Sequence, residues 1–205
     1  MLDTATASWQ ELNPTGDVPS AMYQHSCAAL GGALFLLDGG DLWKYDVAAN
    51  ALSIVDVPGI KPPAIPPYNE RMVNVRGLIW VHRHFSSPME LWVFDPEQGT
   101  WRDVSSHVQG ASPPIRSYHG CTVADDRLYV FGGRVVDLID TRSDLWVLDA
   151  AEGYLRPEAE LVWRELSGAL LGSAPDRRAG MGMAALGGRM YIFGGESLKT
   201  GRHIP

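Results

Sequence analysis

One short apolar segment that ends in two glycines occurs three times in this chain. The copies are LFLLDGG at 34–40, RLYVFGG at 127–133 and RMYIFGG at 189–195. The last two are nearly identical and begin 62 residues apart (189 − 127). Neither carries a residue pattern typical of catalysis, so we interpret the repetition as structural rather than chemical.

Two further motifs recur with this segment in a fixed order: an acidic residue followed by Leu and Trp, then Trp, two polar residues and an aliphatic residue. They are DLWKYD at 41–46, ELWVFD at 90–95 and DLWVLD at 144–149, and WQEL at 9–12, WRDV at 101–104 and WREL at 163–166. Trp43 and Trp92 are 49 residues apart (92 − 43), which indicates a unit of about 50 residues. Gly, Pro, Asn and Asp between the apolar runs predict four short antiparallel strands in each unit.

Three ordered motifs in register resemble the kelch repeat of β-propellers, the blade type also found in the central domain of galactose oxidase. The resemblance covers residues 8–196. It implies an all-β propeller segment of about four blades: three complete four-stranded blades, an N-terminal fourth strand and a C-terminal half blade. The expected units within this single domain are 13–57, 58–104, 105–167 and 168–205, and the strand at 8–12 is expected to complete a terminal blade.

Four kelch blades would be an unusual ring. We therefore expect the chain to be part of a longer propeller, or to be completed by another chain. An open arc leaves a blade face and sheet edges exposed, which predicts self-association through the open edge. The second unit departs from the pattern, because His82 and Arg83 stand where the two glycines are expected.

The tryptophans of the two Trp-containing motifs are expected to fill the wedges between blades. Each can bury on the order of 200 Å². They are Trp9, Trp43, Trp92, Trp101, Trp146 and Trp163. Cys27 and Cys121 fall at equivalent positions of two units, and we expect buried, unpaired thiols without a catalytic role.

Composition excludes several classes of partner. The formal net charge is −7, with 24 acidic and 17 basic residues and no long basic cluster, which argues against binding nucleic acid or an anionic membrane. The longest near-apolar run, at 27–37, is too short to cross a bilayer. With two cysteines, no glycosylation sequon and no secretory signal pattern, we expect a cytoplasmic protein, with a nuclear location as the alternative.

The search for chemistry yields no catalytic motif and no cofactor site. A Gly-X-Ser-X-Gly elbow is absent. His82 and His84 form a His-X-His pair that a strand would place on one face, a spacing that can bind a metal. No nearby carboxylate or cysteine completes the set, so we predict no metal site.

The loops before the first strand of a unit are the better binding candidates. Arg116 and Arg178 occupy matching positions of such loops, and the kelch resemblance implies that arginines there line the channel mouth and capture acidic peptides. The alternative is that they brace neighbouring blades or face water. Arg71 of the second unit aligns poorly and stays doubtful.

Aromatic residues recur in the same loops. They are Tyr23, His25, Tyr118 and His119. They supply either a contact surface at the mouth or packing at the strand entrance.

We therefore expect a non-enzymatic protein–protein interaction module with a protein or peptide partner of acidic character. The alternative is the propeller of a metal-dependent enzyme or specifier protein, similar to galactose oxidase or to plant nitrile-specifier proteins.

Overall fold

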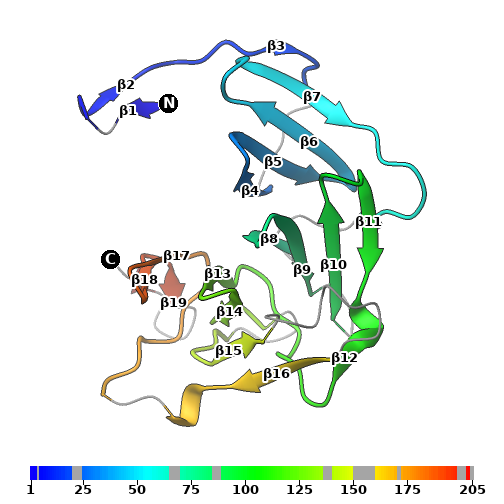
Figure 1. Cartoon of the computed structure of the whole chain (residues 1–205). Helices are drawn as coiled ribbons and strands as arrows, with labels where there is room; N and C mark the ends of the chain where they lie inside the picture. The colour runs from blue at the N-terminus through cyan, green and yellow to red at the C-terminus, as the bar shows by residue number, and fades with distance from the viewer. Residues whose placement is uncertain are drawn as a thin grey trace.

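The fold is seen in a computed structural model, which describes residues 1–3, 5–19, 25–64, 70–84, 89–135, 140–149, 160–169, 172–197 and 202–203. Within these ranges the regular elements are β-strands and short 3-10 helices, and none of the helices is long and apolar enough to cross a membrane. The sheets stand side by side around an arc, from the cyan sheet at the upper right of Figure 1 to the orange sheet at the lower left. The predicted all-β propeller segment is confirmed.

The first sheet holds the antiparallel strands of the first unit. In chain order these are β4 (Ser26–Leu30), β5 (Ala33–Asp38), β6 (Asp41–Asp46) and β7 (Ala51–Val55). A short strand, β3 (Thr15–Gly16), is added parallel to β7.

The second sheet has the same meander without the added strand. It contains β8 (Glu70–Val75), β9 (Leu78–Arg83), β10 (Glu90–Asp95) and β11 (Thr100–Asp103). The 3-10 helix η2 (Ser105–His107) leads out of it.

The third sheet repeats the arrangement of the first. Its meander is β13 (Gly120–Ala124), β14 (Arg127–Phe131), β15 (Leu145–Leu148) and β16 (Leu161–Glu165). Strand β12 (Val108–Gln109) lies parallel to β16. The two added parallel strands were not expected from the repeat.

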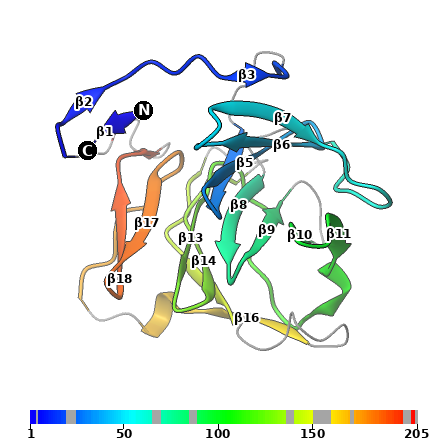
Figure 2. The same ribbon diagram turned by 45° about the horizontal axis from the view of Figure 1, so that its top comes forward.

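The fourth sheet contains only the first two strands of a unit. These are β17 (Gly182–Leu186) and β18 (Arg189–Phe193), preceded by the 3-10 helix η4 (Ser167–Ala169). A small hairpin of β19 (Glu196–Ser197) and β20 (Arg202–His203) follows. The turned view in Figure 2 shows β17 and β18 at the end of the arc, beyond the third sheet.

The N-terminal strand does not complete this fourth sheet as expected. Strand β2 (Ser8–Trp9) instead pairs with β1 (Leu2–Asp3) in a separate two-stranded hairpin. The expected wedge position of Trp9 is also wrong, because 80% of the residue is exposed. The physical reason is that β18 has no adjacent third strand among the described residues with which a fourth strand could pair.

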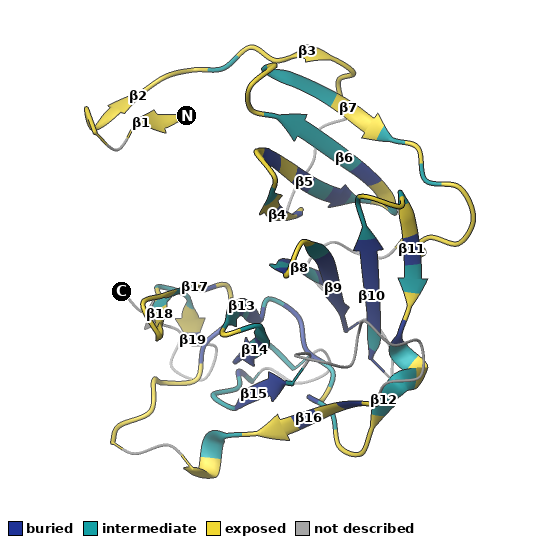
Figure 3. Ribbon diagram, in the orientation of Figure 1, coloured by how far each residue is buried: buried dark blue, intermediate teal, exposed yellow. Residues whose placement is uncertain are grey.

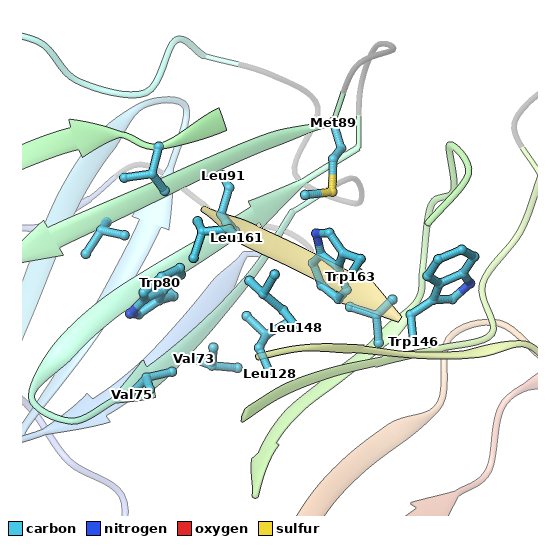
Figure 4. Packing of buried hydrophobic residues seen from close by; sticks show 13 residues of the cluster. Val73, Val75, Trp80, Met89, Leu91, Leu128, Trp146, Leu148, Leu161 and Trp163 are labelled. Carbon is cyan, nitrogen blue, oxygen red and sulfur yellow. The ribbon is translucent and has the colours of Figure 1, made fainter. Parts of the chain in front are cut away.

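Each boundary between neighbouring sheets is filled by one hydrophobic cluster. The largest joins the second and third sheets and includes Trp80, Leu91, Leu128, Trp146 and Trp163, seen from close by in Figure 4. A second cluster joins the first and second sheets, and a small third one joins the third and fourth. Figure 3 shows the result, with dark blue strands in the middle of the arc and yellow ones at both ends.

Four of the six motif tryptophans occupy the predicted wedges. Trp92, Trp101, Trp146 and Trp163 are buried in these clusters, whereas Trp43 in the first sheet is only half-buried. A tryptophan is therefore covered where a neighbouring sheet lies over its face, as a stacked repeat requires.

The two glycines at the end of β14 are required by the neighbouring backbone. Gly132 has φ +61°, and a Cβ there would lie 2.7 Å from the carbonyl oxygen of Arg178 in the next unit. Gly133 has φ +102°, and its Cβ would lie 2.9 Å from the carbonyl oxygen of Ser117. In the second sheet His82 pairs with Leu91 as Phe131 pairs with Leu145. Arg83 and His84 therefore stand at the two glycine positions, one residue later than expected, and β9 continues as a strand through Arg83.

Candidate functional site

A pocket opens where the first strands of all four sheets approach one another. Strand β4 lies beside β8, β8 beside β13, and β13 beside β17. The pocket has a volume of about 510 Å³. Its lining residues are His25, Ser26, Cys27, Arg71, Met72, Tyr118, His119, Gly120, Cys121, Gly180, Met181 and Met183. We call it the axial pocket.

One sulfur-containing residue per sheet lies at the same register position of the first strand and lines this pocket. Cys27 pairs with Leu36 on β5, and Met72, Cys121 and Met183 pair with the equivalent residues of β9, β14 and β18. The sequence showed this equivalence for the two cysteines but not for the two methionines. Each of the four sheets therefore contributes a polarizable sulfur-containing side chain to the axial pocket.

The two cysteines differ in burial although their positions are equivalent. Both are free thiols, but Cys27 is exposed and Cys121 is half-buried, so the expectation of buried thiols is wrong for Cys27 and met only in part by Cys121. Cys27 belongs to β4 of the first sheet, at one end of the arc, where no other described sheet packs on the outer side of β4. Burial raises the pKa of the Cys121 thiol to about 12, so this thiol stays protonated and a poor nucleophile.

Arg71 supplies the positive charge of the axial pocket. Its Nε donates to the carbonyl oxygen of His119 at 2.8 Å, and its Nη1 donates to the carbonyl oxygen of Glu70 at 2.6 Å. Burial lowers the pKa of this guanidinium from its ordinary value. Among the described lining residues it is the one Arg or Lys, and none is Asp or Glu. Sequence alignment left this residue doubtful because its loop lacks the Pro-X-X-Arg spelling.

Three of the six predicted binding residues lie at the axial pocket. His25 is exposed and Tyr118 half-buried, so both present side-chain surface there. His119 lies in the wall but is fully buried, which corresponds to the packing alternative. Tyr23 falls outside the described residues.

Arg116 does not line the pocket; its guanidinium braces the third sheet. It is fully buried, and Nη1 and Nη2 donate to the two carboxylate oxygens of Asp144 at 2.9 and 2.7 Å. Nε donates to the carbonyl oxygen of Pro114, and Nη1 also donates to that of Gly132. This geometry corresponds to the bracing alternative, and a role in partner binding stays a prediction.

The same contacts explain why an acidic residue precedes Leu-Trp in the motif. Besides the two bonds from Arg116, Asp144 accepts a hydrogen bond from the indole Nε1 of Trp146 at 2.8 Å. Burial raises the pKa of Asp144, but the bonds and charge of Arg116 outweigh it, so the pKa lies below its usual value. The carboxylate therefore ties the loop arginine and the wedge tryptophan to one strand.

The second sheet builds this brace with an arginine from another position. Arg83, at the end of β9, donates from Nη1 to Glu90 at 3.0 Å, and Glu90 also accepts from Nε1 of Trp92. Arg83 lies 3.5 Å from Glu70 as well. Burial raises the pKa of Glu70 to about 7, against the opposing charges of Arg83 and Arg71. The missing glycines of this unit thus coincide with a relocated arginine.

His82 and His84 join His119 in a fully buried cluster between the second and third sheets. Nδ1 of His82 lies 3.0 Å from Nε2 of His119, and the ring centroids of His82 and His84 are 4.5 Å apart. In the described part of the chain, no group of three or more His, Cys, Asp or Glu side chains has the arrangement of a metal site. Burial lowers the pKa of all three histidines, so the cluster is neutral at physiological pH.

The stacked four-stranded sheets define this chain as a segment of a β-propeller. A family model, the KLHDC2/KLHL20/DRC7 Kelch-repeats domain, matches residues 1–133 and 80–203, two overlapping matches that together cover nearly the whole chain. The chain belongs to this kelch-repeat family, and the resemblance seen in the repeat motifs is confirmed.

Curated relatives are more distant and longer. The Rab9 effector protein with kelch motifs of Xenopus laevis is 25% identical over 95% of this chain and 55% of its own length. Kelch domain-containing protein 3 of Homo sapiens is 26% identical over 73% of this chain and 30% of its own. The N-(sulfonatooxy)prop-2-enimidothioate sulfolyase of Thlaspi arvense is 22% identical over 100% of this chain and 61% of its own. The chain thus spans from about a third to three fifths of these relatives.

Proposed function

We propose that this chain is a non-enzymatic protein–protein interaction unit that receives an acidic group of its partner in the axial pocket. Membership in the kelch-repeat family supports an interaction role in general, and one relative is named as an effector of Rab9. The choice of the axial pocket is our own and rests on its geometry.

The observation that carries the proposal is the charge of the pocket wall. Arg71 is held by two backbone carbonyls, and none of the described lining residues is Asp or Glu; the neighbouring Glu70 lies outside the lining, 3.5 Å from Arg83. A half-buried guanidinium favours an anion, and a carboxylate can accept two parallel N–H bonds from it. Tyr118 and His25 lie at the same pocket and offer aromatic surface to the rest of the peptide.

Selection of displayed peptides on the immobilised chain tests this function. We expect enrichment of peptides with Asp, Glu or a free C-terminal carboxylate, whose affinity falls on the order of tenfold in Arg71→Gln, the loss of one charge-assisted interaction. Arg76→Gln is the matched control, because Arg76 lies in the turn after β8 and pairs with Asp126 at the surface. The proposed role of the axial pocket would be contradicted if the selected peptides carried no acidic group, or if Arg71→Gln and Arg76→Gln bound them with equal affinity.

A second function is favoured by one comparison. The sulfolyase relative matches the full length of this chain, which keeps a specifier-type or metal-dependent enzyme as the alternative. His82 and His84 are the residues to test. Stoichiometric iron, copper or zinc in purified protein, lost in a His82→Ala, His84→Ala variant, would favour the enzyme; metal-free protein that binds peptides favours the interaction unit.

We also propose a cytoplasmic or nuclear location. Its support is the pair of free thiols, which suits a reducing compartment.

A further inference from the structure

A second pocket lies on the outer side of the arc, at the boundary between the first and second sheets. It is lined by the start of β6, by the end of β7 and the loop that follows it as far as Lys61, and by Trp101 of β11. Its volume is about 370 Å³, and none of its described lining residues also lines the axial pocket. Figure 1 shows the end of β7 approaching the start of β11 on this side. We call it the outer pocket.

The wall of the outer pocket is apolar. Leu42 and Trp101 are 2% and 4% exposed and belong to the cluster that joins the first and second sheets, against which Val55 also packs. Ile54, which lines the pocket as well, is 46% exposed. The pocket therefore offers a ligand apolar surface on a well-packed boundary, in the volume range of small-ligand sites.

Asp56 places a carboxylate beside this apolar wall. It directly follows Val55, the last residue of β7, which pairs with Leu42. In the second and third sheets the equivalent residues are Ser105 and Ser167, whose hydroxyls accept the backbone N–H of the leucine in the acidic–Leu–Trp motif at 2.9 Å. Within the described part of the chain, the exposed carboxylate of Asp56 forms no such bond and no ion pair, so it is available to a ligand.

The remaining charges give the outer pocket a net negative charge. Asp41 pairs with Lys61 at 3.1 Å, and both side chains are about half exposed, so these two charges balance and that of Asp56 remains. The surrounding sequence has the same sign, because residues 1–61 contain seven acidic and two basic residues, a net charge of −5 (2 − 7). Most of the formal charge of −7 thus belongs to the first unit.

We propose that the outer pocket binds an arginine side chain of a second protein, in a segment where apolar residues flank the arginine. Charge complementarity selects a cation, and the apolar wall selects a weakly hydrated one. A guanidinium meets both conditions, since it can pair with the Asp56 carboxylate through two N–H bonds while its plane lies against apolar or indole surface. A lysine ammonium is more strongly hydrated and fits this wall less well. This site is independent of the acidic group proposed for the axial pocket.

A capped tripeptide, acetyl-Val-Arg-Leu-amide, is the direct probe, because it has no carboxylate for the axial pocket. In a titration of the full chain at low salt, followed by amide and indole NMR shifts, we expect changes at residues 40–42 and 54–57 and at the Trp101 indole. Replacing the arginine of the peptide by the neutral isostere citrulline is expected to weaken binding on the order of tenfold, and so is Asp56→Asn in the protein. Glu165→Gln is the matched control, since Glu165 is an exposed acidic residue at the end of β16, the corresponding strand of the third sheet.

Lys61→Gln tests the pocket in the opposite direction. Removing the lysine releases Asp41 for the ligand, so we expect the tripeptide to bind about threefold more tightly, which a merely damaged surface would not produce. Equal affinities of the arginine and citrulline peptides, equal affinities of Asp56→Asn and Glu165→Gln, or shifts confined to the axial pocket would each overturn the proposal. A dimer in sedimentation analysis that the tripeptide dissociates would instead assign this face to a second copy of the chain.

Discussion

Nδ1 of His82 and Nε2 of His119 lie 3.0 Å apart, which links β9 of the second sheet to the entry of β13 in the third. One ring nitrogen must accept this hydrogen bond, so at least one of the two imidazoles is neutral. His84 packs against His82, and all three residues are fully buried. Burial lowers the pKa of His84 to about 3 and holds those of His82 and His119 well below 6.5.

The cluster predicts that the protein loses stability in mild acid. Below about pH 6.5 the unfolded chain binds protons at these histidines and the folded chain does not, so each lowers the unfolding free energy by about 1.4 kcal/mol per pH unit. Glu70 acts in the opposite direction, because its pKa is raised from 4.5 to about 7 and the folded state binds the proton more tightly. The net expected loss is about 3 kcal/mol per unit between about pH 6 and pH 5, measured by urea unfolding.

His84→Leu isolates one member of this cluster. Neither ring nitrogen of His84 has a hydrogen-bond partner among the described residues, so the leucine removes a titrating group without breaking a bond. The loss of stability per pH unit should become smaller by about 1.4 kcal/mol. A slope equal to that of the original protein would show that His84 does not contribute.

Removing the brace of the third sheet should be costly. Arg116→Ala leaves Asp144 as a nearly buried carboxylate without its cation, and breaking such a pair from one side costs about 3–5 kcal/mol. The control is Arg177→Ala, whose ion pair with Asp140 is exposed on both sides and is worth about 0.5 kcal/mol. Similar unfolding free energies for the two variants would contradict the bracing role.

A glycine of the repeated motif should be irreplaceable for steric reasons. In Gly132→Ala the new Cβ meets the backbone of Arg178, so either the loop of the fourth unit or β14 must shift, at a cost of about 1–3 kcal/mol beyond the strain of a positive φ. Gly187→Ala controls for that strain: its φ is +57° and no described atom lies within 4 Å of its Cβ. Thermal unfolding of both variants separates the two effects.

The tryptophan wedge predicts a large difference between two members of one motif. Trp163 is 3% exposed in the cluster between the second and third sheets, so Trp163→Ala should cost about 3–5 kcal/mol. Trp9 carries the same sequence motif but is 80% exposed, and Trp9→Ala should change stability by less than about 0.5 kcal/mol. Equal losses in chemical unfolding would contradict the structure of the N-terminal hairpin.

The repeat motifs predicted the strands and their order because each motif is a local signal. Turn glycines, alternating apolar residues and the acidic–Leu–Trp spelling lie within a few residues of one another. The parallel strands β3 and β12 were not predicted, since two residues carry no pattern. Trp9 was placed wrongly because its burial depends on whether a neighbouring strand lies beside it, and the motif does not record that.

The candidate site was predictable only in part, because it depends on contacts between units. His25, Tyr118 and His119 were found from recurrence within loops, and all three lie at the axial pocket. Arg71 is the second residue of strand β8 rather than part of a matching loop, so alignment did not reveal it. The partner of Arg116 could have been inferred from the sequence. An acidic residue precedes every Leu-Trp, and Arg116 and Arg178 are 62 residues apart (178 − 116), the same spacing as the two glycine-ending segments that begin at 127 and 189.

Hydrogen exchange of the full chain with a selected acidic peptide tests the proposed interaction role most directly. Binding in the axial pocket predicts slower exchange of the amides around Arg71 and from Tyr118 to Cys121, and no such slowing in Arg71→Gln. Protection confined to the outer strands β7, β11 and β16, with unchanged exchange at β8 and β13, would contradict binding in the axial pocket.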